Sequence, residues 1–113
     1  MNPDNVKCVT EFPLTPKSAR KLIADLATYY SYRVKFSKHA RQRLTERKVS
    51  TQQVFSLLRS SSSRFQELPH QDPRGDWKMN LEGMAAGELL RVSLVLKRVE
   101  SDPSAFIVTV LLP

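Results

Sequence analysis

The residues best suited to chemistry lie in one short segment, from Ser37 to Arg47. If this segment is a helix, His39, Arg43 and Arg47 stand at positions i, i+4 and i+8 and share one face. An imidazole can exchange a proton near neutral pH, because its unperturbed pKa is about 6.5. Guanidinium groups can hold a phosphate and offset the charge that grows on a phosphorane. These residue types in this order suit RNA cleavage without a metal.

The roles follow from that chemistry. His39 would act as general acid or base while Arg43 and Arg47 hold the scissile phosphate. Glu46 can pair with Arg43 and is the candidate for the second proton transfer, and Thr109 could supply a hydroxyl. A plainer interpretation is that the arginines solubilise a helix, His39 is a local cap partner, Glu46 makes a weak surface pair and Thr109 simply suits a strand.

Positive charge is concentrated around the same segment. The 113 residues carry 18 Lys and Arg against 11 Asp and Glu, which gives a net charge of +7. Residues 17–48 alone hold ten basic and two acidic residues, so the rest of the chain is close to neutral. This concentration favours a polyanion or an acidic protein as partner over solubility alone. The cations expected to contact nucleic acid are Lys35, Lys38, Arg41, Lys48, Arg91 and Lys97, although solvated strand positions explain the last two about as well.

Composition limits the class of protein. A hydrophobic share of 41% and a charged share of 26% are typical of a soluble globular domain. The apolar stretches are too short to cross a membrane, and residues 1–12 have no apolar core of a secretion signal. Cys8 is the single cysteine, and no His, Cys and carboxylate cluster is evident, so we expect no disulfide, metal or cofactor. We therefore expect a cytoplasmic protein of one domain.

The pattern then indicates the elements that must position these residues. Thr15 and Pro16 are typical of a helix start, and an apolar stripe follows to Tyr30. Tyr32–Phe36 alternates as a short strand with a cationic face. Ser37 can cap a helix over 38–47, and Ser50 with Gln53 has the spacing of a capping box for a third helix.

Beyond residue 63 the spacing of the apolar residues changes from the helical period of three to four residues to the alternation of extended strands. Strands are expected at Phe65–Leu68, around Trp77–Leu81, around Leu90–Lys97 and at Phe106–Leu112, the last as a central strand; 69–75 is expected to be a loop and 83–87 a turn region. His70 would then be an exposed loop residue, and Trp77 a core residue. The order predicts an α+β fold, with helices on one face of a mostly antiparallel four- to five-stranded sheet.

The segment around His39 also resembles a family motif. Phe36-Ser37-Lys38-His39-Ala40, with Arg43, Glu46-Arg47-Lys48-Val49-Ser50 and Thr109-Val110 further on, resembles the S-x-H-A-x-x-R-x-x-E-R signature of a small bacterial and phage family known only as a domain of unknown function. The likeness covers about 32–112, and residues 1–31 look like an added N-terminal arm and helix. That family is similar in layout to the RelE-like and barnase–EndoU–colicin group of ribonuclease toxins.

The resemblance implies a RelE-like toxin fold that is usually countered by an antitoxin. Two hypotheses remain. In the first, the protein is a toxin-type, metal-independent ribonuclease or RNA-binding protein of a toxin–antitoxin-like system. In the second, it is a non-enzymatic phage or mobile-element module whose basic face engages nucleic acid or an acidic host protein.

Overall fold

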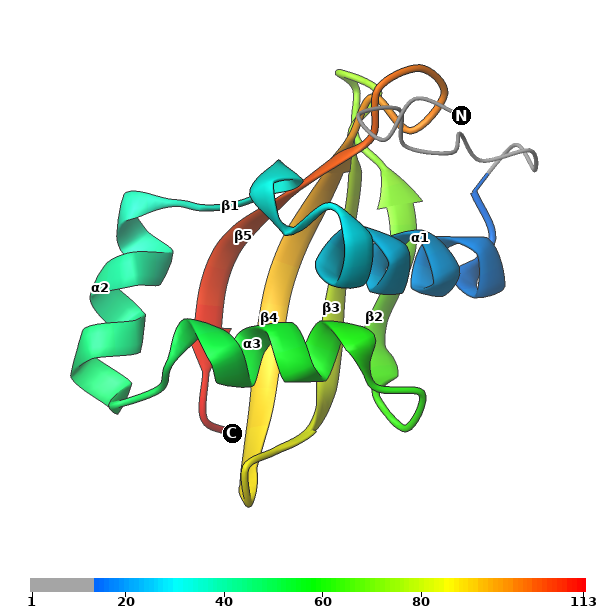
Figure 1. The fold of residues 1–113 in the computed structure, drawn as a ribbon. Coiled ribbons are helices and arrows are strands. Elements are labelled where there is room, and N and C mark those ends of the chain that lie inside the picture. The colour runs from blue at the N-terminus through cyan, green and yellow to red at the C-terminus, as the bar shows by residue number, and fades with distance from the viewer. Residues whose placement is uncertain (1–13) are drawn as a thin grey trace.

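The computed structural model describes residues 14–113, so the predicted arm and Cys8 lie outside it (Figure 1). Within this range the fold is α+β, with three α-helices, a short 3₁₀ turn and five strands. In chain order these are α1 (Pro16–Tyr29), η1 (Ser31–Arg33), β1 (Val34–Phe36), α2 (Lys38–Arg47), α3 (Thr51–Arg59), β2 (Arg64–Gln71), β3 (Trp77–Ala85), β4 (Glu88–Lys97) and β5 (Ser104–Leu111).

The helix starts are those that the sequence predicts. The Thr15 side chain accepts a hydrogen bond from the Ser18 backbone and Pro16 opens α1, while Ser50 and Gln53 form the capping box of α3. Ser37 caps α2, since its hydroxyl accepts from the backbone N–H of Ala40. Each cap satisfies a backbone donor that the first helical turn leaves without an intrahelical partner.

The strands form one mixed sheet in the order β1-β5-β4-β3-β2. Three neighbouring pairs are antiparallel, and β1 pairs with β5 in parallel. The strand predicted from Tyr32 begins only at Val34, because Ser31–Arg33 forms the 3₁₀ turn. The last strand is interior, as its apolar sequence predicts, although β4 occupies the centre of the order.

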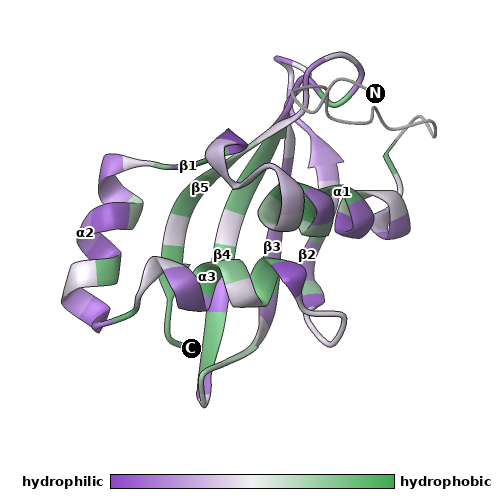
Figure 2. Cartoon of the chain, viewed as in Figure 1, coloured by the Kyte–Doolittle hydropathy of each residue, from purple (hydrophilic) through white to green (hydrophobic). Residues whose placement is uncertain are grey.

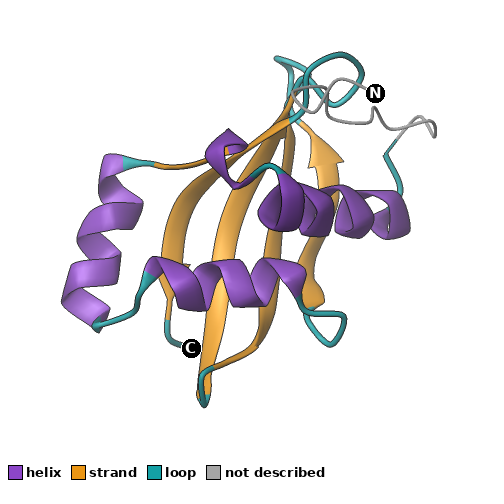
Figure 3. Ribbon diagram, viewed as in Figure 1, coloured by secondary structure: helices purple, strands orange, loops and turns teal. Residues whose placement is uncertain are grey.

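The hydrophobic core lies between the sheet and the helices on one of its faces. Figure 3 shows α1 and α3 in front of the sheet, whereas α2 lies beside β5. Inward strand residues are almost fully buried, and the largest are Met79, Leu81, Leu90, Leu94, Leu96 and Ile107. The alternate residues of the same strands are partly or fully exposed. The sheet therefore has a second face that no helix of the described range covers, here called the open face.

Two more expected boundaries are wrong. β2 continues through Pro69 to Gln71, so His70 is a strand residue instead of a loop residue. Proline is tolerated there because β2 is an edge strand, whose outer side needs no ladder hydrogen bond. β3 likewise continues through Gly83 to Ala85, which leaves Ala86 and Gly87 as the turn. Trp77 is buried, as predicted.

Gly83 has a steric reason to be glycine inside a strand. A Cβ atom at this position would lie 2.8 Å from Cδ1 of Leu57 and 3.2 Å from the Cα atom of Ser63. The missing side chain lets α3 and the connector that follows it approach β3 closely. The glycine therefore marks close packing between α3 and the sheet.

Candidate functional site

The sheet holds the start of α2 in place. The Ser37 hydroxyl donates a hydrogen bond to the backbone oxygen of Val108 (2.9 Å), and the Ser37 backbone N–H donates to Ile107 (2.9 Å). Further along, Ala40 and Leu44 are buried in the core. These contacts fix which side of α2 faces the protein. The rest of the helix is strongly hydrophilic, as Figure 2 shows.

Three of the predicted catalytic residues are in contact on the outer surface of α2. Arg43 lies between the other two. Its Nε atom donates to Nε2 of His39 (3.5 Å), and its Nη1 atom donates to Oε2 of Glu46 (2.8 Å). The other Glu46 oxygen accepts from the Gln42 amide (3.0 Å). We call His39, Arg43 and Glu46 the α2 cluster.

This geometry places an imidazole directly beside a guanidinium. The Arg43 Nε–H points at Nε2 of His39, so the two groups can contact the same ligand. A guanidinium can bind an anionic group such as a phosphate. His39 and Glu46 are exposed and Arg43 is half-buried, so a large ligand can reach all three.

The remaining predicted catalytic residues lie apart from these contacts. Arg47 shares the helix with the cluster and is exposed, and it forms no ion pair within residues 14–113. Thr109 is on β5, where it pairs with Ser93 of β4. It directly follows Val108, whose backbone oxygen anchors Ser37. The structure therefore brings His39, Arg43 and Glu46 into contact. It places Arg47 at the end of the same helix and Thr109 on β5.

The predicted nucleic-acid contacts divide into three groups. Lys38, Arg41 and Lys48 are exposed on or directly after α2. Lys35 and Lys97 are exposed at the sheet, with Lys35 paired to Phe106 across β1 and β5. Arg91 differs from these exposed cations because its guanidinium forms an ion pair with Glu82 of β3, at 2.8 Å.

Arg33 is a basic residue of this region that is tied into the fold, as is Arg20, whose guanidinium donates to the backbone oxygen of Ser61. The Arg33 guanidinium binds the carboxylate of Asp102 in the connection between β4 and β5. That hydrogen bond raises the pKa of Arg33 above its usual range. The pair links η1 to the connection between β4 and β5, where Arg33 also donates to the backbone oxygen of Pro103. Arg33 therefore has a structural role.

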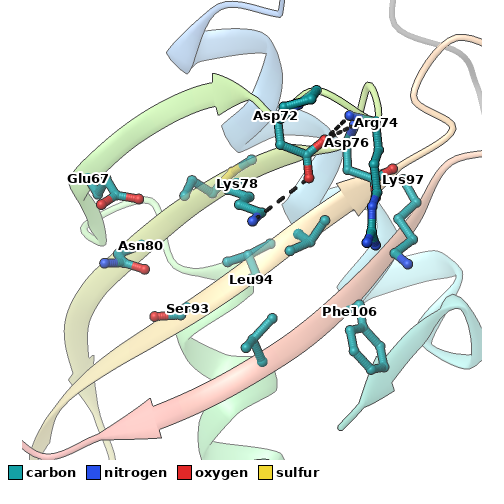
Figure 4. Close-up of a pocket in the computed structure, with 14 residues that line it drawn as sticks. Glu67, Asp72, Arg74, Asp76, Lys78, Asn80, Ser93, Leu94, Lys97 and Phe106 are labelled. Carbon is teal, nitrogen blue, oxygen red and sulfur yellow. Dashed lines mark hydrogen bonds and ion pairs between the residues drawn. The ribbon is translucent and has the colours of Figure 1, made fainter.

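Sequence reasoning missed a pocket of about 700 Å³ on the open face (Figure 4). Its lining includes Arg74, Lys78 and Phe106. The sequence predicts Phe106 in a central strand with apolar residues on both sides, yet it is half-exposed at this face. The available signal was the alternation of β3 and β4, which leaves Lys78, Asn80, Ser93 and Val95 on the side opposite the core.

Metal-binding clusters and membrane-spanning helices are both absent from the described residues. No group of three or more His, Cys, Asp and Glu side chains within 14–113 is arranged to hold a metal ion. No helix in this range is both long and apolar enough to cross a membrane.

Comparison with protein families, curated proteins and solved structures finds no match to this chain. Its function must therefore be inferred from the chain's own residues.

Proposed function

We propose that the protein is a toxin-type, metal-independent ribonuclease that binds RNA along α2. The observation that supports this most directly is the arrangement around Arg43, which contacts an imidazole and a carboxylate at once. Two groups able to transfer protons thus flank a phosphate-binding guanidinium. The exposed cations Lys38 and Arg41 extend the basic surface on the same helix.

The proposed reaction uses the ribose 2′-hydroxyl as nucleophile. A base removes its proton, the 2′-oxygen attacks phosphorus, and the bond from phosphorus to the 5′-oxygen breaks. An acid then protonates the leaving 5′-oxygen, so the products carry a 2′,3′-cyclic phosphate and a 5′-hydroxyl. His39 and Glu46 are assigned to the two proton transfers, and Arg43 and Arg47 to the charge on the phosphorane. Thr109 is the proposed hydroxyl donor from β5.

A second candidate function is a non-enzymatic module of a phage or mobile element. The observation in its favour is the exposure of His39 and Glu46, since proton-transfer groups gain most from a site that excludes water. Such a module would use the cations of α2 to engage nucleic acid or an acidic host protein. In the ribonuclease hypothesis, an acidic antitoxin would cover the same cations, and both proteins would act in the cytoplasm.

Separating cleavage from binding tests the proposal. A labelled single-stranded RNA is incubated with the wild type, His39→Ala and the control variant Gln52→Ala, whose side chain is exposed on α3 away from the cluster, and binding and cleavage are measured together. We expect His39→Ala to lower cleavage by about 100-fold or more while binding changes little. If expression of the wild type inhibits growth, expression of His39→Ala should not.

The outcome that contradicts the assignment is equally specific. His39→Ala that cleaves RNA as fast as the wild type removes this residue from the mechanism. A wild-type protein that binds RNA without cutting it and does not slow growth leaves the non-enzymatic module as the function.

A further inference from the structure

The open-face pocket is a second candidate binding site, separate from the α2 cluster. Cross-strand pairing shows how its floor is built. Lys78 of β3 pairs with Val95 of β4 and Val95 with Phe106 of β5; Phe106 pairs in turn with Lys35 of β1, which lies beyond the pocket lining. Paired residues share one face of a sheet, so these four side chains form a row. The row places an aromatic ring between cationic strand residues.

The apolar part of the floor lies around Phe106. Its ring is half-exposed, and Val95 and Val108 line the same pocket. Val108 is 37% exposed, although it is an aliphatic residue in an interior strand. Aromatic rings at an exposed sheet face are the usual platforms on which nucleobases stack.

Two cations lie at the same end of the pocket. The Nζ atom of Lys97 is 5.5 Å from the centroid of the Phe106 ring, and Figure 4 shows Arg74 reaching over this end from the loop between β2 and β3. Within the described part of the chain, neither Arg74 nor Lys97 has a carboxylate at ion-pair distance. Their charges are therefore available to an anionic group of a ligand.

The carboxylates of the pocket have different positions and partners. Asp72 is 12% exposed, accepts from the backbone N–H groups of Arg74 and Asp76, and lies 3.8 Å from Lys78. Glu67 lies at the opposite end from Arg74, on the strand next to Asn80 (Figure 4). With Asp76, the lining holds three carboxylates against three cations. Balanced charge favours a ligand with one phosphate and several hydrogen-bond donors over a run of phosphates.

We propose that this pocket binds one nucleotide, with its base against Phe106 and its phosphate held by Arg74 and Lys97. The amide of Asn80 and the carboxylate of Glu67 would accept hydrogen bonds from the amino groups of the base or from the ribose hydroxyls. The volume of about 700 Å³ is that of a typical small-molecule site. A free nucleoside monophosphate and a nucleotide within single-stranded RNA present the same chemistry.

The test is a titration of the intact protein followed by NMR and calorimetry. The probes are the four nucleoside 5′-monophosphates, ribose 5-phosphate and a hexauridylate. The variants are Phe106→Leu, which keeps an apolar side chain but removes the ring, and Lys97→Gln. Lys17→Gln is the matched control, because Lys17 is an exposed cation of α1 outside the pocket. His39→Ala is included to separate this site from the α2 cluster.

We expect at least one monophosphate to shift the backbone amides of β3, β4 and β5. Phe106→Leu and Lys97→Gln should each weaken its binding about tenfold, while Lys17→Gln and His39→Ala leave it unchanged. Ribose 5-phosphate should bind more weakly than the nucleotide and should not respond to Phe106→Leu, since it has no base to stack.

The hexauridylate distinguishes a free nucleotide from a nucleotide within RNA. If hexauridylate binds more tightly than uridine monophosphate, and Phe106→Leu loses this binding, the ligand is RNA. If hexauridylate binds more weakly than uridine monophosphate, the ligand is a free nucleotide. The proposal is overturned if no monophosphate shifts these strands, or if Phe106→Leu and Lys97→Gln bind as the wild type does. Loss of cleavage in His39→Ala has no bearing on this result.

Discussion

Ser37→Ala tests how α2 is attached to the sheet, because one hydroxyl makes two contacts. It accepts from the N–H of Ala40 at 2.9 Å and donates to the oxygen of Val108 at 2.9 Å. Loss of an N-cap costs about 1 kcal/mol. The bond to Val108 is exposed, so water replaces it in part and its loss adds about 0.5 kcal/mol. We expect the free energy of unfolding to fall by about 1.5 kcal/mol, which is about 6 °C in Tm for a domain of this size.

Two further variants separate these contributions in urea denaturation. Ser37→Thr keeps both bonds and should be close to the wild type. Ser37→Asp keeps the acceptor for the cap but cannot donate to Val108, so it should lose only about 0.5 kcal/mol. The reasoning is refuted if Ser37→Ala unfolds at the wild-type urea concentration, or if Ser37→Asp is as unstable as Ser37→Ala.

Other predictions concern packing, charge and the ion pair of the α2 cluster. Gly83→Ala should lower the free energy of unfolding by about 1–3 kcal/mol, because its Cβ atom would lie 2.8 Å from Leu57; unchanged thermal unfolding would contradict this. If the four cations of α2 each contact one phosphate, RNA affinity should fall about 50-fold between 50 and 200 mM salt, and Arg47→Ala should reduce the slope of the log–log plot by about 0.7. An affinity that is indifferent to salt would exclude this electrostatic binding. Glu46→Gln should change thermal stability by less than about 1 kcal/mol, because its pair with Arg43 is partly exposed to water; a larger loss would show that the pair is structural.

Much of the fold was predictable because the helix-capping residues and the spacing of apolar residues indicate the same elements that the folded core contains. Thr15, Ser37 and Ser50 each begin a helix as their capping chemistry indicates. The alternation of Leu90, Val92, Leu94 and Leu96 identified the inward side of β4, and all four are buried. Such patterns are read from neighbouring residues alone, so they need no knowledge of the tertiary structure.

The wrong predictions occur where contacts between distant parts of the chain determine the local secondary structure. Proline at position 69 suggested a loop, but an edge strand has no partner strand on its outer side, so a missing N–H there costs no ladder hydrogen bond. Gly83 suggested a turn, although it is required by the approach of Leu57. Phe106 lies in an interior strand, as its apolar neighbours predict, but the sequence does not show that one face of β5 lacks a covering helix.

The candidate site was predictable only in part, for the same reason. His39, Arg43 and Glu46 are three or four residues apart on one helix, so spacing alone indicates their contacts. The open-face pocket joins β3, β4, β5 and the loop around Arg74. Arg74 and Val108, for example, are 34 positions apart in the sequence (108 less 74), and only the register of the sheet brings such residues together.

The most direct test of the central claim is the chemistry of the RNA ends. A defined single-stranded RNA is incubated with the purified protein in EDTA, and the products are analysed by mass spectrometry beside those of His39→Ala. Proton transfer by His39 and Glu46 predicts fragments with 2′,3′-cyclic phosphate and 5′-hydroxyl ends that the variant does not produce. Intact RNA, or equal yields of these fragments from the wild type and the variant, would contradict the claim.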